Sequence, residues 1–233
     1  MAARLGIGAL IFAFVDPLDA KRWVDECHSI AKSDECVPVG HTVNANIAMV
    51  TSFSLHQDRE EAINRGLEGF EFFGYALGAL CGFGEHKPGR TNLFKQFREA
   101  REKQLAEMPV DIAESLTGAR GGIGTPDDMR GHLKKFEKVG VDQVTFIQQE
   151  CMNKHEHICE SLELFTSEVM PEFKAREAER EGKKAEELAP YIEAAVARKK
   201  FMPMPGDKDI PVFPALGRSI AEGEQDPNKE VQV

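Results

Sequence analysis

The sequence lacks a hydrophobic run long enough to cross a bilayer. Its longest apolar segment, residues 7–15, falls well short of the roughly 20 residues that a membrane-spanning helix needs. Arg4 is the only positive charge before this segment, and Asp16-Pro17 follows it in place of a cleavage pattern of small residues. We interpret the segment as a buried strand, with a secretory signal as the minor alternative, and expect no membrane partner.

Paired cysteines and an excess of positive charge are also missing. The cysteines are odd in number and form no C-x-x-C pair: Cys27, Cys36, Cys81, Cys151 and Cys159. This pattern is typical of free thiols in a reducing compartment, so we expect a cytoplasmic protein. The net charge of -10 argues against nucleic acid or an anionic membrane as the main partner.

What the sequence does contain is a repeated alternation of strand-like and helix-like segments. Apolar or alternating stretches predict strands at 6–15, 41–51, 121–124 and 141–147. Helical periodicity predicts helices after Asp16, over 58–77, after Thr125 and over 155–173. Such alternation predicts an α/β fold in which a parallel sheet is covered by helices.

Helix start signals support these boundaries. Asp16-Pro17 and Thr125-Pro126 each place a capping residue before a proline, and Asp58 precedes Glu61 at the spacing of a capping box. Gly140 is expected to end the helix that begins after Thr125.

Two regions interrupt or follow the alternation. Residues 78–118 form an insertion with a Gly-rich stretch and a charged helix over 93–108, as in functional lids or binding loops. Residues 174–233 are expected to form a second part of the chain, a charged helix to 200 and then a Pro-rich tail. The first part is then residues 1–173.

Several segments together resemble the luciferase-like flavin-dependent monooxygenases. Residues 2–10 resemble the family's fifth barrel strand, and residues 38–46 its sixth. Residues 122–127 with 140–142 resemble the seventh strand, its helix and the start of the eighth strand. Residues 160–171 resemble the closing helix. The four matches follow the family's order over residues 1–173.

The resemblance implies the last four βα units of a (β/α)8 TIM barrel. A whole barrel has eight strands and about 250 residues, so the chain is expected to be a truncated or partial form, or to work with a partner that supplies the other half. The implied activity is that of an oxidoreductase, a monooxygenase that uses reduced flavin (FMN or a similar cofactor) and O2 on a small organic substrate. A flavin reductase is an implied partner, and we expect a homo-oligomer.

Candidate site residues lie where barrel strands end, because ligands bind at the carboxyl ends of parallel strands. Phe12 and Phe14 could supply apolar surface to a flavin ring, or could be core residues. Asn44 and Asn46 could bond the polar edge of the ring, or other buried groups. Gly124 and Thr125 precede a helix whose N-terminus could anchor an anion, although the same residues also make an ordinary βα turn. No catalytic residue can be named.

Two rival hypotheses remain open. Cys151, His155 and Cys159 are spaced four apart and could hold zinc, but a regular helix spreads them too far along its axis for one ion. The other alternative is a non-catalytic half-barrel or structural subunit, because a partial barrel leaves unpaired strand edges.

Overall fold

The computed structural model divides the chain into two units, residues 1–199 and residues 200–233. It describes residues 1–12, 17–18, 20–82, 84–107, 121–148, 153–199, 201 and 204–212. Predictions that fall on Phe14, Asp16, Cys151 or the end of the tail therefore lie outside the described residues. Among the residues described, no helix is long and apolar enough to cross a membrane.

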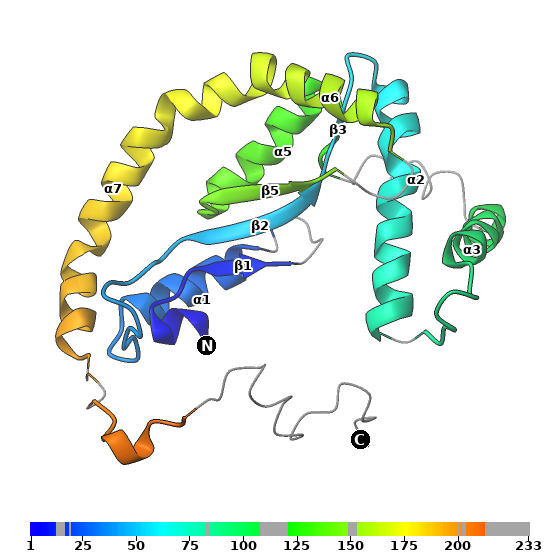
Figure 1. Cartoon of the computed structure of the whole chain (residues 1–233). Helices are drawn as coiled ribbons and strands as arrows, with labels where there is room; N and C mark the ends of the chain where they lie inside the picture. The colour runs from blue at the N-terminus through cyan, green and yellow to red at the C-terminus, as the bar shows by residue number, and fades with distance from the viewer. Residues whose placement is uncertain are drawn as a thin grey trace. The chain divides into compact units, whose positions relative to one another are not determined.

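The first unit is an α/β structure built on parallel strands (Figure 1). Its elements are β1 (Ala9–Ile11), α1 (Lys21–Ala31), β2 (Ile47–Ser52), β3 (Ser54–Leu55), α2 (Arg59–Leu77), α3 (Leu93–Glu107), β4 (Ile123–Gly124), α5 (Pro126–Val139), β5 (Gln143–Ile147), α6 (His155–Leu164) and α7 (Met170–Ala197). In the second unit, the described residues include a short 3-10 helix, Asp207–Asp209. The prediction of a parallel α/β fold is confirmed.

The strand order differs from that of consecutive barrel strands. One sheet has the order β1-β2-β5, and a second pairs β3 with β4. β5 thus lies directly beside β2, with Met49 opposite Val144, whereas β4 pairs only over two residues. Just before β4, Gly122 lies so close to Ser52 that a Cβ atom there would meet the Ser52 carbonyl oxygen at 1.9 Å, so only glycine fits at this position.

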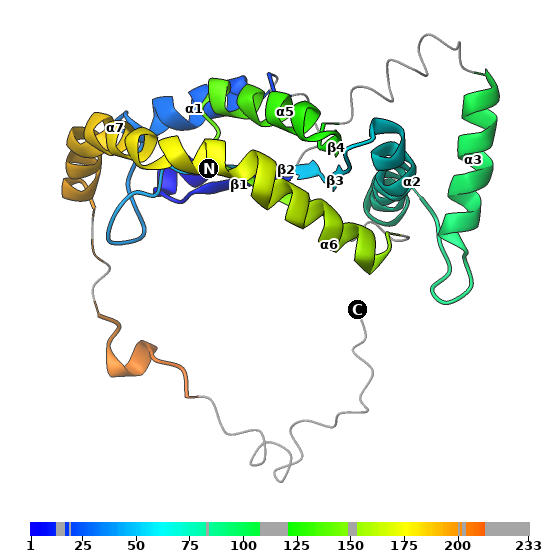
Figure 2. The same ribbon diagram turned by 90° about the horizontal axis from the view of Figure 1, so that it is seen from above.

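The core lies between the sheet and the helices on one of its faces. Ile47 and Met49 of β2 pack with Val24 of α1 and with Met129 and Phe136 of α5. Figure 2 shows α1 and α5 on the same side of the strands. These β2 residues alternate along the strand, so the period of two that the sequence predicted is the one that fills the core.

Each of the four predicted strands begins later than expected. The strand predicted at 6–15 begins only at Ala9, because Gly6 adopts a left-handed conformation (φ 63°) that ends a 3-10 helix, Ala2–Leu5. The strand predicted at 41–51 begins only at Ile47, because the Asn44 side chain accepts a hydrogen bond from the Asn46 N–H and holds an irregular turn. The strand predicted at 141–147 is β5, which begins at Gln143.

The helix starts are partly confirmed. Asp58 caps α2, but Glu61 turns to Arg65 and does not complete a capping box. Thr125 caps α5 with a complete capping box, and left-handed Gly140 ends it as predicted. Pro17 is not the first residue of a helix, because a turn separates it from α1, which begins at Lys21.

The helix predicted at 155–173 is the start of a longer helical run. α6 continues through a π-helical segment, Phe165–Val169, into α7, which ends at Ala197. The boundary expected at residue 173 is therefore the middle of a helix, and the two compact units divide at residue 199 instead. Val169, in the π-helical segment, is fully buried in the core of the first unit.

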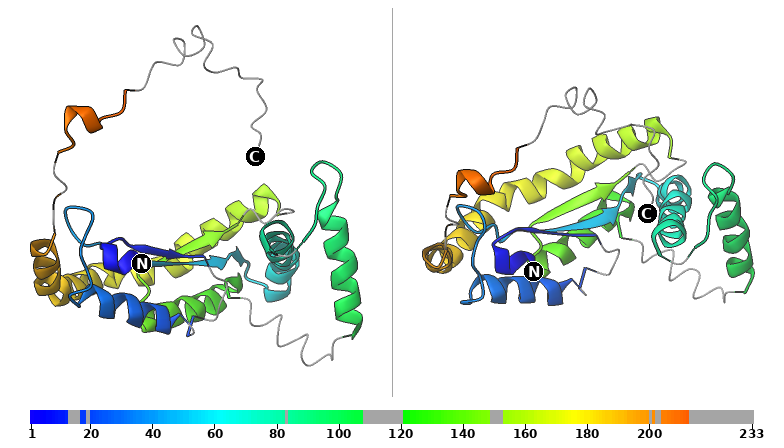
Figure 3. Two further views of the ribbon diagram at one scale, coloured as in Figure 1. Left: turned by 90° about the horizontal axis from the view of Figure 1, so that it is seen from below. Right: turned by 60° about the horizontal axis from the view of Figure 1, so that its bottom comes forward.

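The insertion is anchored to the carboxyl end of the sheet. α2 continues into a π-helical turn, Gly78–Gly82, and then α3 packs back against α2. Phe72 of α2 makes edge-to-face contacts with Phe94 and Phe97 of α3, at centroid distances of 5.1 and 5.5 Å. Both views in Figure 3 show α2 and α3 side by side.

Candidate functional site

The carboxyl ends of the parallel strands form the edge at which a ligand site is expected. The residues that follow these ends are Phe12 after β1, His56 after β3, Thr125 after β4 and Gln148 after β5. α2 lies across this edge in Figure 1, where the arrowheads of β2 and β5 point toward it. The candidate site is therefore bounded by strand ends and by α2.

Phe12 is the sequence-predicted residue whose position agrees best with a ligand role. It follows β1 directly, and its side chain is 54% exposed. Its ring centroid lies 6.2 Å from that of Phe73 on α2. The alternative of plain core packing does not describe a ring this exposed, so Phe12 offers apolar surface at the carboxyl edge.

Asn44 and Asn46 lie at the amino ends of the strands, opposite the carboxyl edge. β2 begins at Ile47, so both precede the strand and cannot lie at its carboxyl end as expected. Asn46 accepts a hydrogen bond from Lys184 of α7, and its backbone carbonyl accepts one from the Ala9 N–H. Both asparagines thus organise the loop that enters β2 and connect it to neighbouring segments.

Gly124 and Thr125 do lie at the carboxyl edge, but the donors of Thr125 are engaged. The Asp128 carboxylate accepts from the Thr125 N–H at 3.0 Å and from its hydroxyl at 2.9 Å. The hydroxyl in turn accepts from the Asp128 N–H. The Asp128 carboxylate therefore occupies the N-terminus of α5, where the sequence predicted that an anion could bind.

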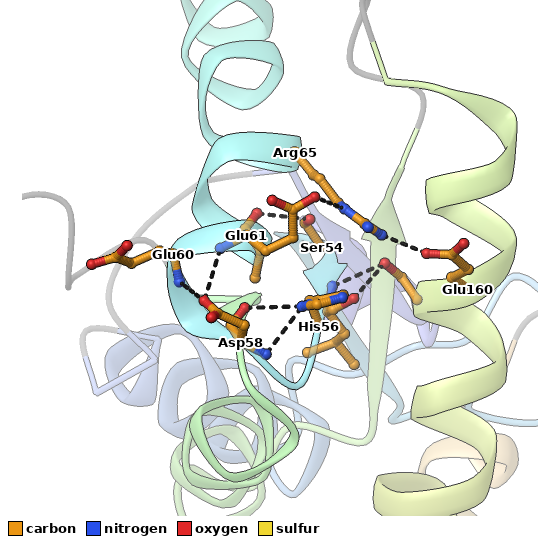
Figure 4. A network of polar contacts seen from close by, with 10 residues as sticks. Ser54, His56, Asp58, Glu60, Glu61, Arg65 and Glu160 are labelled. Carbon is orange, nitrogen blue, oxygen red and sulfur yellow. Dashed lines mark hydrogen bonds and ion pairs between the residues drawn. The ribbon is translucent and has the colours of Figure 1, made fainter.

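A network of charged groups follows β3 at the same edge (Figure 4). The Arg65 Nε donates to Glu61 at 2.6 Å, and its Nη1 donates to Glu160 of α6 at 2.5 Å. Arg65 is largely buried, with a side chain 14% exposed. Its hydrogen bonds hold the pKa of both carboxyls below the ordinary value, partly opposed by desolvation.

Serine hydroxyls complete the end of β3. The Ser161 hydroxyl of α6 donates to the Leu55 carbonyl at 2.9 Å and accepts from the Leu55 N–H at 3.0 Å. It therefore satisfies both backbone groups of a buried strand residue, as a neighbouring strand would. Ser54 is the other residue of β3. Its hydroxyl donates to the Ala62 carbonyl and so joins β3 to α2.

Sequence reasoning missed His56, Arg59 and Arg65. His56 and Arg59 follow β3 within a few residues, and Arg65 lies in the second turn of the helix that comes next, so the end of the strand was the signal that could have identified them. The His56 Nδ1 accepts from the Asp58 N–H at 3.0 Å, which leaves Nε2 to carry the proton of the neutral ring. The Arg59 side chain is 51% exposed and lies 3.7 Å from Asp128, so it is the cation at this edge most accessible to a ligand among those just named.

The zinc alternative gains no support from the described residues. The Cys159 Sγ lies 3.5 Å from the His155 Nε2 on α6. Cys151 lies outside the described part of the chain, and within that part no three His, Cys, Asp or Glu side chains are placed to hold a metal ion.

A separate hollow of about 450 Å³ lies beside β5, between α5 and α7. Its floor is aromatic, with Phe136, Phe146, Phe165 and Phe173, and its border is charged. Because Phe136 and Phe146 belong to the packing between the sheet and its helices, this hollow lies on the helix side of β5 and not at the carboxyl edge.

Comparisons with known proteins give only weak similarity. No known protein family matches the sequence, and neither does any curated protein. Among solved structures, a monooxygenase, RslO1 from Streptomyces bottropensis, is similar at 17% identity and a TM-score of 0.43, over 74% of this chain and 44% of that one.

Two further structures are similar at the same level. The coenzyme F420 dependent tetrahydromethanopterin reductase from Methanopyrus kandleri has 19% identity and a TM-score of 0.41, over 71% of this chain and 45% of that one. Apo-MsnO8 has 18% identity and a TM-score of 0.41, over 70% and 47%. The chain thus spans less than half the length of each structure, and similarity this low does not establish an activity.

Proposed function

We propose that this chain is a component of a flavin-dependent oxidoreductase of the luciferase-like kind. The observation that carries the proposal is the place of the resembling sequence segments in the fold. Residues 2–10 lead into β1, 38–46 into β2, 122–127 form β4 with the start of α5, and 140–142 lead into β5. Segments that resemble successive barrel units thus enter parallel strands of one α/β unit, in the same order along the chain.

We further propose that the flavin lies at the carboxyl edge of the strands. Phe12 supplies exposed apolar surface there, and Arg59 supplies an accessible positive charge of the kind that binds a phosphate. When bound, reduced flavin supplies the chemistry that activates O2 for attack on a small organic substrate. The part of this chain is to bind and orient the flavin, and a flavin reductase is the partner that supplies it reduced.

The assignment to Arg59 can be tested by comparing two flavins. FMN carries a phosphate and riboflavin does not, so titration of both against the purified chain separates recognition of the ring from recognition of the phosphate. Arg59→Gln is expected to weaken FMN binding about tenfold or more and to leave riboflavin binding unchanged. Arg98→Gln, on exposed α3, is the matched control and is expected to bind both like the wild type.

The second candidate is a non-catalytic structural subunit. The uncovered outer edge of β1 favours it, because an unpaired edge is a surface for another chain. A chain that circular dichroism shows to be folded, and that binds neither flavin, would contradict the oxidoreductase proposal and leave this one.

A further inference from the structure

The outer edge of β1 is not covered by another described strand. β1 pairs with β2 on one side, and no other described strand pairs with it. The exposed fractions are 94% for Met1, 47% for Ile7 and 63% for Leu10. Figure 1 shows β1 as the outermost strand, on the side of the sheet away from β5.

Backbone groups at this edge are directed outward. The Ala9 N–H donates to the Asn46 carbonyl at the start of β2. Because successive residues of a strand direct their N–H and C=O groups to opposite sides, the N–H and C=O of Leu10 point to the free edge. One donor and one acceptor are thus available to a further strand.

The sequence of this edge has none of the usual protection. Natural edge strands carry charged residues, prolines or bulges that prevent pairing with another chain. Between Arg4 and Asp16 the sequence contains no charged residue and no proline. An antiparallel pair of two such segments therefore places no like charges opposite one another.

The other edge of the sheet differs in this respect. The hollow beside β5 is bordered by Glu137, Lys174, Glu177 and Arg180. Lys184 of α7 also forms an ion pair with Asp142, just before β5, at 2.7 Å. Charged residues beside a strand are one of the features that protect an edge.

We propose that a second copy of this chain pairs its β1 with β1 of the first, antiparallel about a two-fold axis. A two-fold contact of this kind uses the same surface of each chain and closes at a dimer, without open-ended growth. This inference is independent of the flavin proposal.

The surface available suits a dimer of ordinary size. Met1, Ile7 and Leu10 are exposed apolar side chains on or near this strand, and exposed apolar surface is a mark of interaction sites. A standard interface buries about 800 Å² per partner, of which somewhat more than half is apolar. A hollow of about 210 Å³ between β1 and α1, lined by Ile11, Trp23 and Ile30, can receive further side chains of the partner.

Light scattering coupled to size-exclusion chromatography tests the proposal in flavin-free buffer. The wild-type chain is expected to elute at twice its mass of 25.9 kDa. Leu10→Lys adds a charge to the shared edge and is expected to elute as a monomer. Leu80→Lys, at a comparably exposed leucine on the π-helical turn after α2, is expected to remain dimeric.

Hydrogen exchange locates the contact. The Leu10 amide is expected to exchange slowly at high protein concentration and faster on dilution, whereas the Ala9 amide, bonded within the chain, changes less. Circular dichroism verifies that the variants are folded. A wild-type monomer at high concentration, or a folded Leu10→Lys variant that stays dimeric, would overturn the proposal. Either outcome leaves the flavin titrations unaffected, because they are interpreted for the folded chain in any oligomeric state.

Discussion

At the scale of single residues, Arg65 connects two helices at the candidate site. Its guanidinium joins Glu61 on α2 to Glu160 on α6, and its side chain is mostly buried. Glu61 lies four residues before Arg65 on the same helix, whereas the pairing with Glu160 spans 95 positions and depends on how α6 returns to the sheet. The sequence shows charged residues, but only the fold shows which charges meet.

Arg65→Met is therefore expected to lower the melting temperature by a few degrees. The substitution leaves two carboxylates close together without their shared cation. Arg98→Met is the control, since Arg98 is exposed and pairs only with Glu68 among the ion pairs described for it. Equal melting temperatures for the two variants would contradict the structural role given to Arg65.

His28 gives the molecule a pH-dependent stability. Its Nε2 is buried without a described hydrogen-bond partner. Burial lowers the pKa of His28 below 6.5, and Lys184 lowers it further, while Asp142 opposes the shift. The unfolded chain thus binds a proton on His28 at a higher pH than the folded chain does.

The free energy of unfolding is therefore expected to fall as the pH drops below about 6.5 toward the lowered value. Denaturant titrations of the wild type and of His28→Gln measure this dependence, and the variant is expected to show a shallower slope over that interval. Ser29→Gln is the control, since it changes an exposed neighbour and keeps the wild-type slope. A His28→Gln slope equal to that of the wild type would contradict the assignment.

At the scale of elements, two glycines of α2, Gly66 and Gly74, differ in how closely other atoms surround them. Gly66 faces β3, where a Cβ atom would lie 2.3 Å from the Ser54 Cβ. Gly74 has no atom within 4 Å of the corresponding position. The sequence predicted the bounds of this helix, which depend on local periodicity and capping. It did not distinguish the two glycines, because that requires the packing partner.

Alanine substitution is expected to have opposite effects at these two glycines. Gly66→Ala is expected to destabilise the fold by about 1–3 kcal/mol, since α2 must move away from β3. Gly74→Ala is expected to stabilise it by about 0.4–1 kcal/mol, because alanine has the higher helix propensity and restricts the unfolded chain. Chemical denaturation of both variants gives the comparison, and destabilisation of the same size in both would show that α2 is not packed on β3 in this way.

At the scale of the whole molecule, the sequence predicted the parallel α/β class and most helices. These depend on apolar periodicity and on capping residues such as Asp58 and Thr125. It did not predict that β5 would lie beside β2, since strand order depends on long-range pairing and on how little of β4 is available to pair. It also placed Asn44 and Asn46 inside a strand that begins only after them.

The central claim is that the carboxyl edge of the strands binds flavin. Calorimetric titration of FMN against the wild type, Phe12→Ala and Asn46→Ala tests it most directly, because Phe12 lies at the carboxyl edge and Asn46 at the amino edge. We predict saturable binding to the wild type, binding at least several-fold weaker to Phe12→Ala, and wild-type binding to Asn46→Ala. Loss of binding in a folded Asn46→Ala variant with binding retained in Phe12→Ala, or no binding to the folded wild type, would contradict the claim.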